Sequence, residues 1–406
     1  MQTFKYIARD PASGKKITAE VQASSVQTAM TTLKQQGLTI VDVKPVTDDS
    51  GGLLSRFTNR VAAKDKVLFS RQLSTLINAG LPLVQSLRNV SGQTQNKTLQ
   101  SVIGKIIVDI EAGSSFSQAL SKHPRIFNEV FVNLVAAGEA SGTLDKALER
   151  LADQQEKDAE LMSKIRGAMV YPAIVIVVMV AVVGFMIVTV MPQVEKIYAD
   201  LPGANLPLVT RVLLAVSRFT TKYWWIVLIV LVLGIIFTTK WARSMGGKEA
   251  IDKAKLKMPV FGPLFTKVYM ARFSRTGTTL VASGVPLIQM LDIVAKAVDN
   301  VHVGRSINKA TDKVKSGKSL SDSLKGDPNF TTLVPDMIHI GEESGSLEDM
   351  LSKTADYYEK EVDNQIKTIS TIIEPILMVI LGIVAFTIVA AVLLPVYGLV
   401  NQTNIV

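Results

Sequence analysis

The sequence predicts an all-α membrane protein with two homologous cytoplasmic helical bundles of about six helices each, three transmembrane helices and a small N-terminal ββαβ unit. Three long stretches of the 406-residue chain lack any charged residue, the chain contains an internal duplication, and its other apolar residues recur at helical spacing. These three observations place most of the chain in helices that lie beside or within a membrane.

The uncharged stretches are long enough to cross a lipid bilayer. They cover residues 167–194, 223–239 and 375–406, which are 28, 17 and 32 residues. A bilayer core of about 30 Å needs roughly 20 apolar residues of helix. The middle stretch is the shortest, but aromatic residues at one end and basic residues at the other are typical of interfacial anchors. The other interpretation of this stretch is a buried soluble helix.

Basic residues near the spans predict the orientation of the chain. Thirteen Lys and Arg residues lie within about 20 residues of the spans on one side, whereas the loop 191–222 has four and the tail after the third span has none. This asymmetry predicts a cytoplasmic N-terminus and an external C-terminus. The first residues have no apolar core of signal-peptide length, so we expect an internal span to direct the chain to the membrane.

The composition excludes several classes of function. The net charge of +9 comes from 44 basic and 35 acidic residues whose signs are evenly mixed, so we expect no nucleic-acid-binding face. The chain has no cysteine, which excludes disulfides, thiolate metal sites and cysteine nucleophiles. Its three histidines (123, 302 and 339) are too scattered for a histidine-rich metal site. Charged residues make up 19% of the chain, below the roughly 25% of an average soluble domain.

An internal duplication relates the two halves of the chain. Residues 69–87 and 273–291 are identical at ten of nineteen positions. Further along, GEASGTLDKAL from Gly138 matches GEESGSLEDML from Gly341. The prolines at the ends of two spans also correspond: Pro172 with Pro375, and Pro192 with Pro395. If both soluble copies lie on the same side of the membrane, the chain must return once between them, and residues 223–239 are the candidate.

The repeat and the spans together predict nine consecutive segments. They are the N-terminal unit (1–47), a linker (48–63), the first bundle (64–168), the first transmembrane helix (169–192), an external loop (193–221), the second transmembrane helix (222–240), the second bundle (241–371), the third transmembrane helix (372–400) and an external tail (401–406). Within the N-terminal unit, alternating residues predict strands at 4–8, 17–21 and 39–43, with a helix at 25–37.

Helical spacing and turn residues recur in both copies. Apolar residues at 69, 73, 76 and 77 fall on one face of a helix. Gly80 suits the left-handed position after that helix, and Pro82 the first turn of the next one. Gly284 and Pro286 repeat this pattern in the second copy.

The last helix of each bundle is expected to continue into the membrane. In the first copy it starts near Thr143, a candidate N-cap, and no helix breaker precedes Pro172. In the second copy it starts near Ser346 and continues toward Pro375. Because a continuous helix is stiff, it would pass motion of the bundle to the span.

No catalytic motif is supported by the residues around it, so we expect no enzymatic activity, no metal and no cofactor. The triplet 317–319, Gly-Lys-Ser, resembles a phosphate loop, but Asp312 stands where that loop needs a glycine. Glu374 is the only acidic residue within a predicted span. It lies at the cytoplasmic end, where it either pairs with a basic group of a partner or rests among lipid headgroups.

The whole chain resembles the GspF/PilC family in three features. They are the paired motifs AGEASG and IGEESG (residues 137–142 and 340–345), the doubled F-S-R…AG-x-P-L or SG-x-P-L, and the YP and EP pairs at which two spans begin. Members of this family are the inner-membrane platform proteins of type II secretion systems and type IV pili, and the second copy resembles the pilus branch more. The resemblance implies a homo-oligomer on which a cytoplasmic hexameric ATPase acts. It also implies contacts with pilin or pseudopilin subunits, other inner-membrane assembly proteins and membrane lipid.

Two interpretations apply to the motif residues carried over from this resemblance, which are Glu139, Ser141, Gly142, Glu342, Ser344 and Gly345. In one, the two glutamates contact the ATPase or a second platform subunit. In the other, which we favour, the motif is a helix corner with a carboxylate near a helix N-terminus. The alternative function for the chain is a membrane transporter or channel, and a membrane-anchored enzyme is a further alternative.

Overall fold

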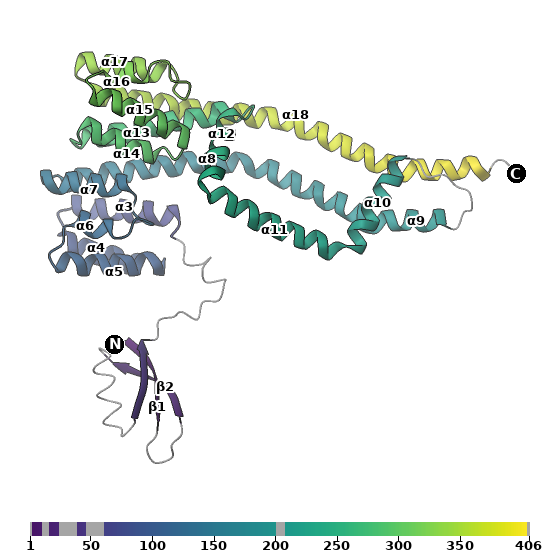
Figure 1. Cartoon of the computed structure of the whole chain (residues 1–406), viewed down its shortest axis with the longest axis horizontal. Coiled ribbons are helices and arrows are strands. Elements are labelled where there is room, and N and C mark those ends of the chain that lie inside the picture. The colour runs from purple at the N-terminus through teal and green to yellow at the C-terminus, as the bar shows by residue number, and fades with distance from the viewer. Residues whose placement is uncertain (1, 10–15, 24–38, 46–60, 200–207, 404–406) are drawn as a thin grey trace. The chain divides into compact units, whose positions relative to one another are not determined.

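The computed structural model of the chain describes residues 2–9, 16–23, 39–45, 61–199 and 208–403 (Figure 1). The chain divides into an N-terminal unit that contains Met1–Val61 and a helical unit that contains most of the remaining residues. In the N-terminal unit, strands β1 (Gln2–Arg9), β2 (Lys16–Ala23) and β3 (Thr39–Pro45) form an antiparallel sheet in the order β2-β1-β3. The predicted helix at 25–37 lies outside the described residues, so the complete ββαβ arrangement stays a prediction, and most of the predicted linker lies outside them too.

The helices of the first copy pack around buried aromatic and aliphatic side chains. They are α3 (Ala63–Asn78), α4 (Leu83–Gln93), α5 (Lys97–Glu111), α6 (Phe116–Ser121), α7 (Glu129–Ser141) and the first part of α8 (Leu144–Phe185). Phe69, Phe127 and Phe131 are at most 2% exposed, and the rings of Phe127 and Phe131 lie 4.8 Å apart. Their rings join α3 to α7, and α3 and α7 both pack on α8.

The second copy repeats this order of helices. It contains α13 (Gly262–Ala282), α14 (Leu287–Ala297), α15 (Val301–Lys315), α16 (Leu320–Leu324), α17 (Leu333–Ser344) and the first part of α18 (Leu347–Thr403). The ring of Phe273, the counterpart of Phe69, packs edge-on against Phe330 at 5.2 Å. Here α13 and α17 both pack on α18, as α3 and α7 pack on α8.

Among the described residues, three helical segments are long and apolar enough to cross a membrane: Leu144–Lys196, Trp224–Arg243 and Leu347–Leu393. The predicted middle span begins later than expected, because α10 (Leu208–Lys222) ends at Lys222 and α11 (Trp224–Arg243) follows it. In α11 no residue is buried. After it, α12 (Met245–Lys257) leads to the second copy.

The helices α8 and α18 extend without a break from the packed helices into the apolar segments (Figure 1). The expectation that one helix joins each soluble copy to its span is thereby confirmed. Pro172 lies inside α8 and does not end it, and Pro375 is likewise within α18. A proline removes one backbone donor, and the remaining hydrogen bonds of such long helices maintain their continuity.

The connection predicted as an external loop is largely helical, which corrects that prediction. After α8 come a π-helical turn, η1 (Met186–Val190), and α9 (Met191–Ala199), and then α10 (Leu208–Lys222) packs on η1 and α18. The buried apolar residues here are Met186, Met191, Val194, Leu214 and Ala391. Because α10 can bury one apolar face against the ends of two spans, these residues fold as a helix instead of a loop.

Candidate functional site

The first G-E-x-S-G turn is a tight corner between α7 and α8. Gly142 ends α7 in the left-handed conformation (φ +70°), which favours glycine. A Cβ on Gly138 would lie 2.6 Å from the Cβ of Ala147 and 3.1 Å from the Cα of Leu144, so only glycine lets the two helices come this close. The second turn repeats the geometry: Gly345 has φ +67°, and a Cβ on Gly341 would lie 2.9 Å from the Cα of Leu347.

The glutamate of each turn binds the N-terminus of a short neighbouring helix. The Glu139 carboxylate accepts hydrogen bonds from the backbone N–H groups of Phe116 (2.6 Å) and Ser117 (2.9 Å), at the start of α6. The Glu342 carboxylate accepts them from Leu320 (2.6 Å) and Ser321 (3.2 Å), at the start of α16. First-turn N–H groups have no partner within their own helix, and a negative charge there is favourable. Both carboxylates therefore have the position that the helix-corner interpretation expects, while a partner contact stays a prediction.

The serine of each turn holds the corner with local hydrogen bonds. Ser141 donates from its hydroxyl to the carbonyl of Ala137 (2.7 Å), and Ser344 to that of Ile340 (2.6 Å). Thr143, expected as an N-cap, stands at that position but its side chain makes no capping bond. Its hydroxyl instead lies 2.7 Å from that of Ser141, because φ −112° and ψ 41° depart from the extended backbone of a capping residue.

The other repeated turn follows the first helix of each copy. Gly80 and Gly284 adopt φ +83° and +78°, as expected from the sequence. Pro82 and Pro286 stand one residue earlier than predicted, before the first helical residue. Each proline has an extended ψ near 144°, and its carbonyl accepts the first helical hydrogen bond, from Ser86 or Met290. These turns position α4 and α14 and expose no unusual chemistry.

An arginine in each F-S-R sequence fastens the first helix of its copy to the helix that enters the membrane. Arg71 on α3 binds Asp153 (2.5 Å) and Glu156 (2.6 Å) on α8. Its counterpart Arg275 on α13 binds Asp356 (2.5 Å) and Glu359 (2.8 Å) on α18. Each arginine with its two carboxylates is here called a clasp, and neither clasp was predicted from the sequence. The signal was present, because D-x-x-E recurs at the same offset as the G-E-x-S-G turns.

The first clasp changes the acid–base properties of its members. Hydrogen bonds from Arg71 lower the pKa of Glu156 below its usual value of 4.5, and hydrogen bonds to Glu156 and Asp153 raise the pKa of Arg71. In the second clasp burial lowers the pKa of Arg275, but hydrogen bonds to Glu359 and Asp356 outweigh this and raise it. Both arginines therefore stay charged at every physiological pH.

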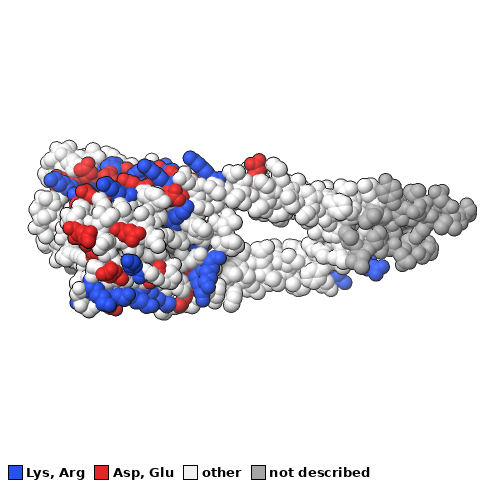
Figure 2. Space-filling model, turned by 90° about the horizontal axis from the view of Figure 1, so that it is seen from above, with Lys and Arg blue, Asp and Glu red and all other residues white. Residues whose placement is uncertain are grey.

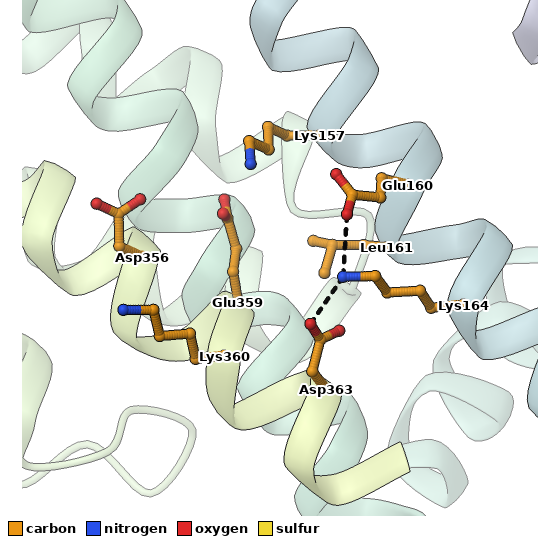
Figure 3. A pocket seen from close by; sticks show the side chains of 8 residues that line it. All are labelled: Lys157, Glu160, Leu161, Lys164, Asp356, Glu359, Lys360 and Asp363. Atoms are coloured by element: carbon orange, nitrogen blue, oxygen red, sulfur yellow. Dashed lines mark hydrogen bonds and ion pairs between the residues drawn. The ribbon is translucent and has the colours of Figure 1, made fainter. Parts of the chain in front are cut away.

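A polar cavity of about 250 Å³ lies between α8 and α18 (Figure 3). Lys164 on α8 bridges its own helix to the other copy, because its ammonium group lies 3.0 Å from Glu160 and 2.7 Å from Asp363 on α18. The cavity is lined by Lys157, Glu160, Leu161, Lys164, Asp356, Glu359, Lys360 and Asp363. Positive and negative groups alternate here, so the cavity has no strong preference for an ion of either sign.

Charged side chains gather over the packed helices and become rare along the extended helices (Figure 2). Glu374 lies on α18 with an exposed side chain, apart from the turns and clasps. Among the described residues no three His, Cys, Asp or Glu side chains are grouped so that they could hold a metal ion.

Comparison with known proteins gives the context of this geometry. The family described as "Type II secretion system (T2SS), protein F" matches residues 69–192 and again residues 273–395, and its N-terminal domain family matches residues 1–44. The chain belongs to the type II secretion system protein F family. The two separate matches confirm the internal duplication.

Relatives that match the full chain are components of pilus and secretion machines. The chain is 39% identical to the type IV pilus assembly protein PilC of Thermus thermophilus, over 100% of both chains. It is 38% identical to PilC of Myxococcus xanthus, over 95% of this chain and 93% of the relative. It is 35% identical to the type II secretion system protein F of Pseudomonas aeruginosa, over 99% of both chains. The higher identities support the pilus branch, and the family is a structural assembly family.

Proposed function

We propose that this chain is the inner-membrane platform of a type IV pilus machine, on which a cytoplasmic hexameric ATPase acts so that pilin subunits leave the membrane and enter a fibre. Family membership and the names of its full-length relatives support a role in fibre assembly. A pseudopilin of a type II secretion system would be handled in the same way. Membrane lipid and other inner-membrane assembly proteins would surround the spans.

The proposed arrangement places both soluble copies in the cytoplasm. Basic residues at the inner ends of the spans favour this orientation, with the N-terminus inside and α9 and α10 outside. The two bundles then cover residues 64–168 and 241–371, and the spans cover residues 169–192, 222–240 and 372–400. Two parallel copies require one return crossing, and α11 is long and apolar enough to supply it.

One observation carries the mechanical part of this proposal: α8 and α18 are unbroken helices that belong both to the packed copies and to the spans. At 1.5 Å per residue, the 42 residues of α8 extend over roughly 60 Å, and the 57 residues of α18 over roughly 85 Å. The arginine clasps fasten α3 and α13 to these helices. A movement that the ATPase imposes on either copy would reach the membrane through a stiff element.

A proline placed in the connecting part of α8 tests this proposal. Ser163 is exposed, and Ser163→Pro would remove a further backbone donor and add a kink to α8 between the packed helices and Pro172, whereas Ser163→Ala would leave the helix unchanged. In a host strain that lacks its own copy, we expect Ser163→Pro to abolish fibre assembly while the full chain still accumulates in the membrane. Ser163→Ala should assemble fibres at the wild-type level. Normal fibres with Ser163→Pro would overturn the mechanical coupling.

A further inference from the structure

The two copies contact each other through different faces. The first copy uses a surface on α7 and α8, here called the forward face, formed by Asn133, Arg150, Gln154 and Lys164. The second copy uses a surface on α13, α14 and α18, here called the rear face, formed by Thr276, Ala282, Gln289 and Asp363. An association through two different faces is heterologous, so it can be repeated from one member to the next.

The polar contacts that hold the forward face of the first copy on the rear face of the second include four between the residues just named. The side-chain amide of Gln154 donates to the hydroxyl of Thr276 at 2.9 Å in a buried position, and Gln289 donates to Asn133 at 3.1 Å. The other two contacts are the guanidinium of Arg150 on the carbonyl of Ala282, and Lys164 on Asp363 at 2.7 Å. This interface is therefore specific at several points along the two copies.

Each copy also contains the equivalent of the face that the other copy uses, and this second face takes no part in the contact between the two copies. The counterparts of the forward face in the second copy are Asp336, Lys353, Tyr357 and Lys367, and those of the rear face in the first copy are Gln72, Asn78, Gln85 and Glu160. Figure 1 shows α3–α5 on one side of α8 and α15–α17 on its other side, so the unused parts on α3, α4 and α17 cannot meet within one chain. Glu160 does not belong to the free part of the rear face, because it lies 3.0 Å from Lys164 in the cavity between α8 and α18.

The unused faces are exposed where the used faces are buried. Gln154 is 6% exposed in the interface, whereas its counterpart Tyr357 is 48% exposed. Thr276 is 4% exposed, whereas its counterpart Gln72 is only half-buried. Leu68, one turn before Gln72 on α3, is 52% exposed, and its counterpart Arg272 lies 3.9 Å from Asp158 on the first copy's α8. The large apolar side chains of Leu68 and Tyr357 are therefore exposed at the two places where the repeat predicts a contact.

The chemistry of the unused faces is complementary. Transferring three of these contacts by the repeat would place the Tyr357 hydroxyl on the Gln72 amide, the Lys353 ammonium on the Asn78 carbonyl and the Gln85 amide on the Asp336 carboxylate. The fourth does not transfer, because Glu160, the counterpart of Asp363, already binds Lys164 within the chain. Each pair has a donor and an acceptor. Among the described residues Lys353 forms no ion pair, so it is available for this contact. The intrachain pair Glu129–Lys296 has no charged counterpart, since Thr332 and Gly92 stand there.

We propose that a second molecule of this chain docks the rear face of its first copy, on α3 and α4, against the forward face of the second copy of its neighbour, on α17 and α18. The same contacts that join the two copies within a chain would then join one chain to the next. A membrane keeps all α8 and α18 helices parallel, so the rotation that relates neighbouring chains is about the membrane normal, and a rotation that closes gives a ring. The inference rests on the proposed function only for this membrane setting.

Cysteine crosslinking of the full chain in the host membrane tests the interface, because the natural chain has no cysteine. The test variant combines Gln72→Cys with Tyr357→Cys, and a short bismaleimide joins thiols that lie close together. We expect the monomer band to shift to a covalent dimer and higher species. Mixing differently tagged Gln72→Cys and Tyr357→Cys chains in one cell should also give a dimer.

Matched controls use the same chain. Val108 is 64% exposed on α5, away from both faces, so Val108→Cys with Tyr357→Cys should stay monomeric. Gln154→Cys with Thr276→Cys should form an intrachain link, which shows that the reagent spans this geometry. The proposal is overturned if Gln72→Cys with Tyr357→Cys gives no interchain product. It is overturned equally if Tyr357→Cys alone links to itself, because that indicates a two-fold interface.

Fibre assembly in the same strains separates this inference from the proposed function. Variants that assemble fibres but give no interchain product would reject the docking surface and leave the platform role standing. If the interchain product forms but the wild-type chain does not support fibre assembly in the host strain, the platform role is rejected and the docking surface is retained.

Discussion

The hydroxyl of Ser217 on α10 donates a hydrogen bond of 2.6 Å to the backbone carbonyl of Ile187 in the π-helical turn η1. In a π-helix this carbonyl would receive the N–H of the residue five positions on, which is Pro192 and has none. The N–H of Met191 is already bonded to the carbonyl of Met186. Ser217, which is 1% exposed, therefore satisfies a carbonyl that the turn leaves without a backbone donor.

We expect Ser217→Ala to destabilise the packing of α10 on η1. An unsatisfied buried carbonyl costs about 1–3 kcal/mol, and Ser217→Thr would keep the hydroxyl. Thermal unfolding of the purified full chain in detergent measures the effect. Thr221→Ala is the control, because the Thr221 hydroxyl bonds only within its own helix. Equal melting temperatures for Ser217→Ala and Thr221→Ala would contradict the role given to Ser217.

Replacing Gly138 tests the close approach of α7 and α8. In Gly138→Ala the new Cβ would lie 2.6 Å from the Cβ of Ala147, so the helices must separate. We expect a loss of about 1–3 kcal/mol in the free energy of unfolding. Gly104→Ala is the control, since that helical glycine has nothing within 4 Å of a new Cβ. It should gain up to about 1 kcal/mol from helix propensity, so the two changes should shift the unfolding midpoint in opposite directions.

Replacing Glu139 distinguishes a helix corner from a partner contact. Glu139→Ala removes the acceptor of two backbone N–H groups and should cost about 1–3 kcal/mol of stability, whereas Glu139→Gln retains one acceptor oxygen and should cost less. Protease resistance of the full chain in membranes measures this loss. If Glu139→Ala instead retains wild-type protease resistance and loses only fibre assembly, the glutamate acts through a partner. Glu343→Gln, at an exposed position of the second turn, should change neither.

The Arg71 clasp should contribute stability that depends on pH. Because the folded-state pKa of Glu156 is lowered, its contribution is complete above the unfolded value of about 4.5 and is lost as the pH falls through the folded value. Arg71→Gln removes the clasp. We expect the wild-type chain to melt at a higher temperature than Arg71→Gln at neutral pH, with the gap shrinking below pH 4.5. The effect is small, since the side chain of Glu156 is 42% exposed. A gap that is constant down to acid pH would exclude an ionic origin.

Local chemistry explains which parts of this structure could be predicted from the sequence. The absence of charge marks the spans, and glycine marks the left-handed positions at 80, 142, 284 and 345, because each is a property of residues adjacent in the chain. The continuity of α8 followed from the lack of a helix breaker before Pro172. These signals require no knowledge of which helices meet.

Contacts between distant segments were not predictable in the same way. The Arg71 clasp joins residues 82 and 85 positions apart, and its charged residues look like ordinary solvated surface until α3 lies on α8. Glu139 finds its donors on α6, a short helix whose position depends on the whole first copy. The fold of α10 was missed because its amphipathic face matters only once the ends of α8 and α18 are present.

The π-helical turn has one further consequence for the duplication. Residues at 186–190 form η1, whereas α18 is regular α-helix at the corresponding positions, and the offset between the copies does not change across them. A π-turn takes up about one residue more than an α-turn, so everything after it is turned by roughly 100° relative to its twin. The two halves are thus matched at their packed ends and mismatched at their far ends. A symmetric object that touched both far ends would meet two different surfaces.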